Sequence, residues 1–403
     1  MNQKEVSKGK SISVVIGCFM LMVSSSVVSN SQGYFLTPVR EFLGCTAAQF
    51  SLYYSFVQIC TVITSLCIGI IMAKVPRRIM LGVGAIGTAA GFVILSQTQA
   101  LWMVYAGAIC VGFFQALIVV PVVQILNSWM PGGSGVAMGF VMSATGFGGI
   151  IMAQVMPRLV EHIDWRTGYL FCAVMFIVCT AIGIILAGEK SPYELAQAAK
   201  PKKKGGFALV AKDPMFWVFI ICCFVGNGAS NIDQHLTPIM QTISFDTAMV
   251  ANAMTLFNIS LLIFKISEGW MYQKASGKRF VLIYSVVSIF GYLALQLAGP
   301  AFYFSIIMKA FASAGITVVF SLVCNEYFGT EFGGAVWGFS WASFQFGATV
   351  FSPIYGACLD RFGNYNYATY IGAVSILVIG GLFYYMLSHK RQVEQIEQAE
   401  TQE

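Results

Sequence analysis

The feature that most constrains this chain is a series of apolar runs, each about as long as a bilayer is thick. A helix needs about 20 apolar residues to cross the hydrocarbon core. The sequence is 57% hydrophobic and only 10% charged, whereas soluble domains are about a quarter charged. We expect twelve spans, at residues 12–35, 46–72, 79–98, 102–127, 136–157, 167–188, 214–239, 247–272, 280–299, 302–325, 336–358 and 367–388.

These runs predict an all-α membrane protein with twelve transmembrane helices in two six-helix bundles, since a helix satisfies its own backbone in lipid. The first run, from Ile12, resembles a signal peptide but is too long and lacks an A-x-A cleavage site. We therefore interpret it as an uncleaved first span.

One long hydrophilic stretch, Gly188 to Lys212, contains the sequence PKKKGG and divides the spans into six and six. The predicted domains are an N-terminal bundle at 1–188, a cytoplasmic linker at 189–213, a C-terminal bundle at 214–390 and a cytoplasmic tail at 391–403.

Lysines and arginines in the short loops predict the orientation, because cytoplasmic loops carry an excess of both. With both termini inside, seventeen of these residues lie inside and four outside, the four being Arg40, Arg158, Arg166 and Arg361. We expect a multi-pass protein of the cytoplasmic membrane with both termini in the cytoplasm. The net charge of +6 then reflects topology and does not indicate nucleic acid as a partner.

An internal repeat relates the two halves at an offset of 200 residues. Leu36-Thr37-Pro38 matches Leu236-Thr237-Pro238, and Gly69 and Lys74 match Gly269 and Lys274. Matched halves imply a pseudo-two-fold axis along the membrane normal. Carriers of that build bind their substrate near the midplane, between the halves.

The eleven cysteines and three histidines are not spaced as a disulfide framework or a metal site. A phosphate loop, an HExxH motif and a GxSxG motif are all missing from the sequence. We expect no metal, no cofactor and no enzymatic activity.

Several motifs resemble those of the major facilitator superfamily, and within it the oxalate:formate antiporter and monocarboxylate transporter branch. The loop after the second span, from Gly69 to Arg77-Arg78, is similar to the superfamily signature but lacks its acidic residue. The other segments that resemble the branch are Asn127–Pro131 with Gly135–Gly139, Asp164–Tyr169, Tyr327–Gly329 and Gly356–Tyr365.

Lys265, four residues before Gly269, lies where this branch has an arginine that binds the substrate carboxylate. The resemblance implies that Lys265 is the carboxylate anchor, as a point charge in place of a planar fork. The sequence departs from the pattern of the branch at two places. Leu261 replaces the aspartate of proton-coupled relatives, and residues 336–358 lack the lysine of the oxalate exchanger.

Charges are costly inside a bilayer, so each ionisable residue within a span is a candidate for function. Lys265 either binds an anion, pairs with Glu268 one turn away, or extends toward the inner surface. Lys309 either faces the cavity or extends outward. Glu268 is expected to gate or to form an intrahelical pair. Asp233 points away from the polar face of its helix and is a candidate for an interhelical contact, for gating or for proton coupling, and His235 is a candidate for gating or proton coupling.

A polar stripe in the second span, at Tyr54, Gln58, Thr61 and Ser65, recurs in the eighth span at Asn258 and Lys265. We interpret it as cavity lining, with interhelical hydrogen bonding as the alternative. The further binding candidates are Tyr34, Asn231, Gln234, Trp341 and Gln345, and Arg77 and Arg78 are further gating candidates.

The leading hypothesis is a monomeric secondary carrier of a small organic anion, a monocarboxylate, working as an exchanger with a counter-anion or as a proton symporter in the lipid bilayer. The alternative is a carrier or exporter of a neutral or drug-like solute, with Lys265 structural. A membrane enzyme, a receptor or a channel lacks support in the motifs.

Overall fold

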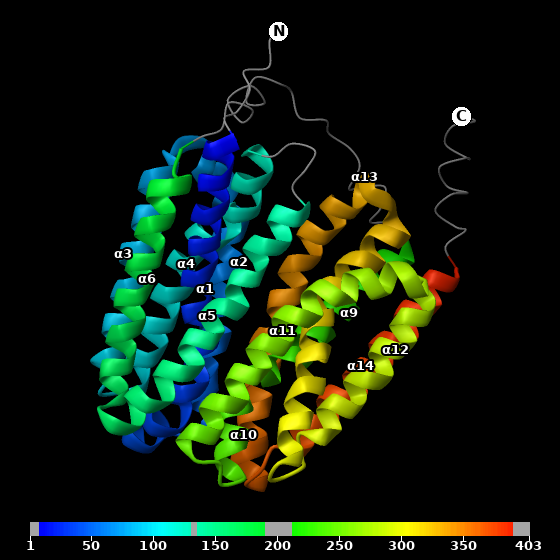
Figure 1. The fold of residues 1–403 in the computed structure, drawn as a ribbon. Helices are drawn as coiled ribbons and strands as arrows, with labels where there is room; N and C mark the ends of the chain where they lie inside the picture. Colours follow the sequence, from blue (N-terminus) through cyan, green and yellow to red (C-terminus); the bar gives the residue numbers. More distant parts are fainter. Residues whose placement is uncertain (1–7, 130–134, 190–211, 390–403) are drawn as a thin grey trace, which may run out of the picture. The chain divides into compact units, whose positions relative to one another are not determined.

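The computed structural model describes residues 8–129, 135–189 and 212–389, which are almost entirely helical (Figure 1). Among them, eleven helices are long and apolar enough to cross a membrane. These eleven overlap eleven of the predicted spans, and the remaining one, 336–358, lies in a long helix described below. The predicted all-α membrane fold is confirmed.

The described residues form two compact units. Unit 1 lies within residues 1–202 and includes 244–255, and unit 2 lies within 203–243 and 256–403. Residues 190–211 and 390–403 lie outside the described part of the chain. Most of the predicted linker and almost all of the tail therefore remain predictions.

Unit 1 holds six long helices, which pack in a fixed pattern of neighbours. The first packs against the fifth and sixth, the third against the fourth and sixth, and the second against the fourth. In chain order they are α1 (Lys8–Leu43), α2 (Ala47–Lys74), α3 (Arg77–Ser96), α4 (Leu101–Trp129), α5 (Gly135–His162) and α6 (Trp165–Ala187).

Capping residues explain where two of the helices begin. Thr46 and Gln49 form a capping box at the start of α2, each side chain bonding the other residue's backbone N–H. Asp213 accepts from the Met215 N–H at 2.8 Å, just before the helix α9 (Pro214–Ser230), with Pro214 in the first turn.

Large apolar side chains cover the outside of the helices. Leu66, Ile86 and Ile185 expose 74%, 71% and 73% of their surface. Water would make such surfaces prone to association, whereas lipid suits them. The outward faces are those of membrane-spanning helices.

In unit 2 the helix that begins at Pro214 packs against the long helix from Ala301 and against the last helix, and the helix that begins at Gly277 packs against the same two. The elements of unit 2 are α9 (Pro214–Ser230), the 3₁₀ helix η1 (Asn231–His235), α10 (Leu236–Thr242), α11 (Thr247–Ala275, whose residues 247–255 belong to unit 1), α12 (Gly277–Ala294), α13 (Ala301–Phe362) and α14 (Asn366–Ser388).

Helix starts confirm the register of the internal repeat. The helices α2, α3 and α4 begin at Ala47, Arg77 and Leu101, and their counterparts α11, α12 and α13 begin 200 residues later in each case, at Thr247, Gly277 and Ala301. The offset of 200 therefore holds from the first span into the fourth.

The helix α13 corrects the expectation of a loop between spans 302–325 and 336–358, because its backbone is helical through all 62 residues. If straight, it would be about 93 Å long, roughly three times the hydrocarbon thickness. It instead turns back on itself near its label in Figure 1, forming two arms. Gly226 of α9 faces Phe320 in the first arm and Gly228 faces Phe351 in the second, so α9 contacts both arms.

Glycine allows the closest approach between α9 and the second arm. A side chain at Gly347 would lie 1.8 Å from the carbonyl oxygen of Phe224, so only glycine fits there. Hydrogen bonds join the same two segments, from Asn227 Nδ2 to the Phe344 carbonyl at 2.7 Å and from Ser343 Oγ to the Ile220 carbonyl at 2.9 Å.

Candidate functional site

The seventh span is interrupted. Its α-helix α9 ends at Ser230, a 3₁₀ turn runs from Asn231 to His235, and α10 resumes at Leu236. Glycines at 226 and 228 weaken the helix just before the break. In unit 1 the matching segment continues within α1. Interrupted spans in carriers commonly lie at binding sites.

The break determines where Asp233 points. A 3₁₀ helix has three residues per turn, which places Asp233 over Ser230, and the Ser230 hydroxyl donates to Asp233 Oδ2 at 3.3 Å. The interhelical role expected of Asp233 agrees with the structure, in which Asp233 pairs with a lysine of α13.

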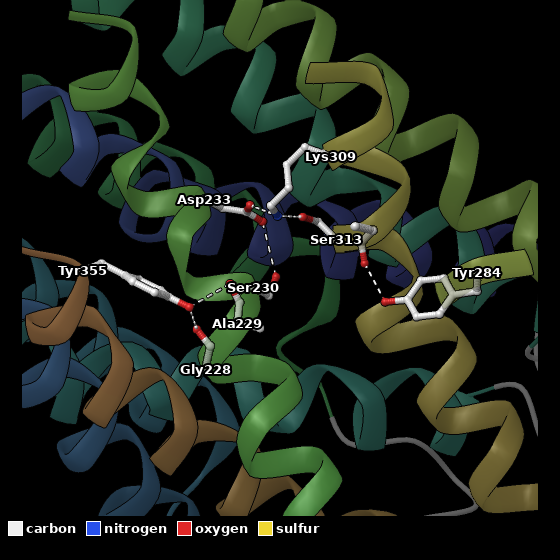
Figure 2. Close-up of polar contacts among 9 residues, drawn as sticks. Gly228, Ala229, Ser230, Asp233, Tyr284, Lys309, Ser313 and Tyr355 are labelled. Atoms are coloured by element: carbon white, nitrogen blue, oxygen red, sulfur yellow. Dashed lines mark hydrogen bonds and ion pairs between the residues drawn. The ribbon is translucent and has the colours of Figure 1, made fainter. Parts of the chain in front are cut away.

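Asp233 forms an ion pair with Lys309, which lies on the first arm of α13 (Figure 2). The Lys309 side chain is completely buried, and its ammonium also donates to Ser313 Oγ at 2.6 Å. The ammonium lies 4.7 Å from the ring centre of Tyr292, a cation–π distance. Lys309 therefore does not extend outward, and the charge of Asp233 compensates its own.

Lys265 and Glu268 lie three residues apart on α11. Lys265 is half-buried, and within the described residues its ammonium has no hydrogen bond and no ion pair. It interacts electrostatically with Glu268 and Asp233. Glu268 is completely buried, and within the same residues neither of its carboxyl oxygens has a hydrogen bond. Lys265 and Glu268 therefore do not form the expected intrahelical ion pair in this structure.

Tyrosines surround these charges. The Tyr284 hydroxyl on α12 donates to the Ala312 carbonyl at 2.9 Å, and this tyrosine interacts electrostatically with Glu268. The Tyr355 hydroxyl on the second arm lies 3.1 Å from the Gly228 carbonyl and 3.4 Å from that of Ala229 (Figure 2). It therefore satisfies backbone acceptors next to the break, as apolar surroundings require.

Sequence reasoning missed Tyr284, Tyr292 and Tyr355. Tyrosine is abundant in this chain, so none stands out by type. The sequence indicated only that buried charges need polar neighbours. It did not indicate which residues supply those neighbours.

The other unit 2 candidates are placed as follows. His235 is completely buried, with its Nδ1 atom 3.2 Å from the Tyr365 hydroxyl. Trp341 stacks on Phe344 with ring centres 5.0 Å apart. Asn231, Asn258 and Gln345 are buried and Gln234 is half-buried.

The repeat shows how unequal the two units are in charge. In the register of 200, Asp233, Lys265, Glu268 and Lys309 correspond to Gly33, Ser65, Ile68 and Ile109. All four ionisable residues of this cluster thus lie in unit 2, at positions where unit 1 is uncharged. We call these four residues the charged cluster.

The polar stripe of α2 serves in part to join helices. The Thr61 hydroxyl lies 3.2 Å from the Gly112 carbonyl of α4 and accepts from Gln115 Nε2 at 3.4 Å. Ser65 Oγ donates to the Thr61 carbonyl at 2.6 Å. Tyr34 and Tyr54 are buried, and Gln58 and Ser65 are half-buried. For Thr61, then, the interhelical alternative is confirmed.

Arg77 and Arg78 contact Glu189, an acidic residue that the sequence motifs did not indicate. Glu189, just after α6, pairs with Lys10 at 2.5 Å and Arg78 at 3.2 Å, and Arg77 donates to its backbone carbonyl. The hydrogen bond and charge of Lys10, with a smaller contribution from Arg78, hold the pKa of the Glu189 carboxyl below its ordinary value. This cluster ties the start of α1 and of α3 to the end of α6.

A family model described as Major Facilitator Superfamily matches residues 14–301. An MFS-type transporter, hasB, of Aspergillus fumigatus is 25% identical over 327 residues, covering 74% of this chain and 70% of its own. Monocarboxylate transporter 12 of Mus musculus is 20% identical, covering 88% of this chain and 81% of its own.

Solved structures share the fold. A point mutant of the nucleoside transporter NupG superposes with a TM-score of 0.79 at 14% identity, covering 94% of this chain and 99% of that one. A D-xylose-proton symporter gives 0.75 at 12% identity, covering 94% and 98%. At such identities the likeness shows the architecture alone.

The family match covers well over half of the chain, and the architecture agrees with it. Both are those of multi-pass membrane transporters. The chain belongs to the major facilitator superfamily of secondary carriers.

Proposed function

We propose that this carrier moves a small organic anion, a monocarboxylate, across the cytoplasmic membrane by alternating access, with both termini in the cytoplasm. Lys265 is the cation that binds the substrate carboxylate.

The observation that carries this proposal is the difference between the two lysines of the charged cluster. Lys309 is buried and bound to Asp233. Lys265 is half-buried and, within the described residues, has no ion pair or hydrogen bond. A cation held inside a membrane protein needs an anionic partner, and for Lys265 a substrate carboxylate meets that need.

Two further points support the proposal. Lys265 stands where the monocarboxylate branch has its carboxylate-binding arginine. A relative that covers most of this chain is named monocarboxylate transporter 12, although at 20% identity its name alone does not transfer.

The test is uptake by the purified protein in proteoliposomes, with radiolabelled formate, acetate, lactate, pyruvate and oxalate. A charge-assisted hydrogen bond contributes about 1.5–3 kcal/mol, so we expect Lys265→Ala to reduce monocarboxylate uptake at least about tenfold. Lys265→Arg should retain part of it.

Lys274→Ala is the matched control, because Lys274 is on the same helix, over the ring of Trp270 at 4.8 Å, and should transport normally. Thermal unfolding of each variant checks its folding. Uptake by Lys265→Ala at the wild-type rate would overturn the anchor role. A wild type that takes up none of the four monocarboxylates of the panel would overturn the proposed substrate class.

One observation favours a second candidate, a neutral solute. If all four residues of the charged cluster are ionised, two positive charges balance two negative ones, and the site has no net charge for an anion. Competition separates the candidates. A monocarboxylate should inhibit uptake and its methyl ester should not, whereas equal inhibition by both would favour the neutral solute.

A further inference from the structure

Two members of the charged cluster are accessible in this structure, and their charges are opposite. Lys309 and Glu268 are completely buried. By contrast, 22% of the Asp233 side chain is exposed, and Lys265 is half-buried. Asp233 and Lys265 come from two different spans and interact electrostatically. The accessible part of the cluster therefore presents one carboxylate and one ammonium to a ligand.

The four charges of the cluster follow an alternating order. Lys309 pairs with Asp233, and Asp233 interacts with Lys265. Lys265 in turn interacts with Glu268, one turn further along α11. The order is therefore positive, negative, positive, negative. Within the described residues Asp233 and Lys265 do not form an ion pair, so the two accessible charges are neighbours in this order without a direct bond.

The Asp233 carboxylate can accept a further hydrogen bond from a ligand. An ionised carboxylate has about four lone-pair sites. Its Oδ1 atom accepts from Lys309, and its Oδ2 atom accepts from Ser230 Oγ at 3.3 Å (Figure 2), which is long for a hydroxyl donor. Lys309 thus holds the carboxylate in place, while part of it stays available to another donor.

We propose that the substrate is an amino acid, whose carboxylate binds Lys265 and whose ammonium binds Asp233. This inference rests on the proposed function, because Lys265 is still the group that binds the carboxylate. It narrows the substrate to a monocarboxylate that also carries an amine.

Charge balance favours such a zwitterion over a simple monocarboxylate. When all four residues of the charged cluster are ionised, the cluster has no net charge, and a zwitterion has none either. A zwitterion between Asp233 and Lys265 continues the alternation, so that each charge lies next to one of opposite sign. A simple monocarboxylate would instead leave one uncompensated negative charge inside the membrane, which is costly.

The test compares three acids with the same three-carbon chain, in proteoliposomes that contain the purified protein. Propionate has no amine, alanine carries one on its second carbon, and β-alanine carries one on its third. A charge-assisted hydrogen bond to Asp233 separates the amino acids from propionate. We therefore expect at least one of them to have a KM at least about tenfold below that of propionate in radiolabelled uptake. Alanine methyl ester, which keeps the amine but lacks the carboxylate, should not inhibit.

The double variant Asp233→Asn/Lys309→Met removes the proposed ammonium site without leaving an uncompensated charge. It should raise the KM of the preferred amino acid at least about tenfold and change that of propionate less than about threefold. Lys274→Met/Glu326→Gln is the matched control, because it removes one cation and one anion of unit 2 that lie outside the charged cluster. It should retain the preference, and thermal unfolding verifies that both double variants fold.

Two results would overturn the inference. The first is a wild type in which neither amino acid has a lower KM than propionate, and that comparison needs no variant. The second is a folded Asp233→Asn/Lys309→Met protein that keeps the preference. Lys265→Ala decides the proposed function separately. If it reduces propionate uptake while no amino acid is preferred, the monocarboxylate stands and the zwitterion falls. A wild type that transports none of the three acids would overturn both.

Discussion

Lys309 and Asp233 are 76 residues apart in sequence and form one ion pair, in which Lys309 is completely buried and Asp233 is half-buried. Removing one member of a buried ion pair leaves an uncompensated charge and destabilises by about 3–5 kcal/mol, while removing both is much less harmful. We predict that Lys309→Met or Asp233→Asn alone lowers stability by about 3 kcal/mol, and that the double variant recovers most of it. Thermal unfolding in detergent, arranged as a double-mutant cycle, measures the coupling.

Lys274→Met is the control for that cycle, because Lys274 contacts an exposed tryptophan and forms no ion pair within the described residues. It should leave stability unchanged and show no coupling to Asp233→Asn. Additive losses in the Lys309 and Asp233 variants would contradict the compensation of charge that we describe.

Residues of the site could be predicted by type but not by pairing. Lys265, Glu268, Lys309 and Asp233 stand out in the sequence because charges are rare within apolar runs. The pairing of these four residues depends on how helices far apart in the chain are rotated about their axes. The local pattern of the sequence does not encode that rotation. Thus Lys309 was expected to face the cavity or extend outward, and the structure binds it to Asp233.

At the scale of elements, the break in the seventh span leaves backbone acceptors inside the membrane, and Tyr355 from α13 satisfies those of Gly228 and Ala229. Tyr355→Phe removes that donor. We predict a loss of about 1 kcal/mol in unfolding free energy, the contribution of a typical hydrogen bond, measured by thermal unfolding in detergent.

Tyr292→Phe is a matched control for that loss. Tyr292 is also buried, but its hydroxyl has no hydrogen bond within the described residues, and phenylalanine keeps the ring under Lys309. It should therefore not lower stability. Equal losses in the two variants would show that the Tyr355 hydroxyl does not support the break.

Spans were predictable because their hydrophobicity is a property of each segment alone, and the predicted spans overlap the observed helices within a few residues at most ends. Breaks and turns were not. Residues 231–235 were taken as α-helix, and residues 326–335 as a loop, whereas the former are 3₁₀ and the latter helical. In both places packing within unit 2 decides between conformations that the sequence leaves close in energy.

At the scale of the whole molecule, the two units share a scaffold and differ in charge. The repeat in sequence already indicated this, because it aligned Leu-Thr-Pro with Leu-Thr-Pro and Ser65 with Lys265. Helix starts 200 residues apart now extend that alignment to Lys309, and add Glu268 and Asp233 to the list of unequal positions.

This asymmetry predicts the result of moving the cation from one unit to the other. Lys265→Ser should abolish monocarboxylate uptake, and adding Ser65→Lys should not restore it. The reason is that Glu268, Asp233 and Tyr284, which interact with the cation or its neighbours, are all in unit 2, whereas Ser65 in unit 1 bonds only the Thr61 carbonyl among the described contacts. Uptake in proteoliposomes measures the effect, and thermal unfolding verifies that each variant folds. Restored uptake in the double variant would mean that a cation at position 65 serves the substrate as well as one at position 265, and that the groups around Lys265 add nothing to its function.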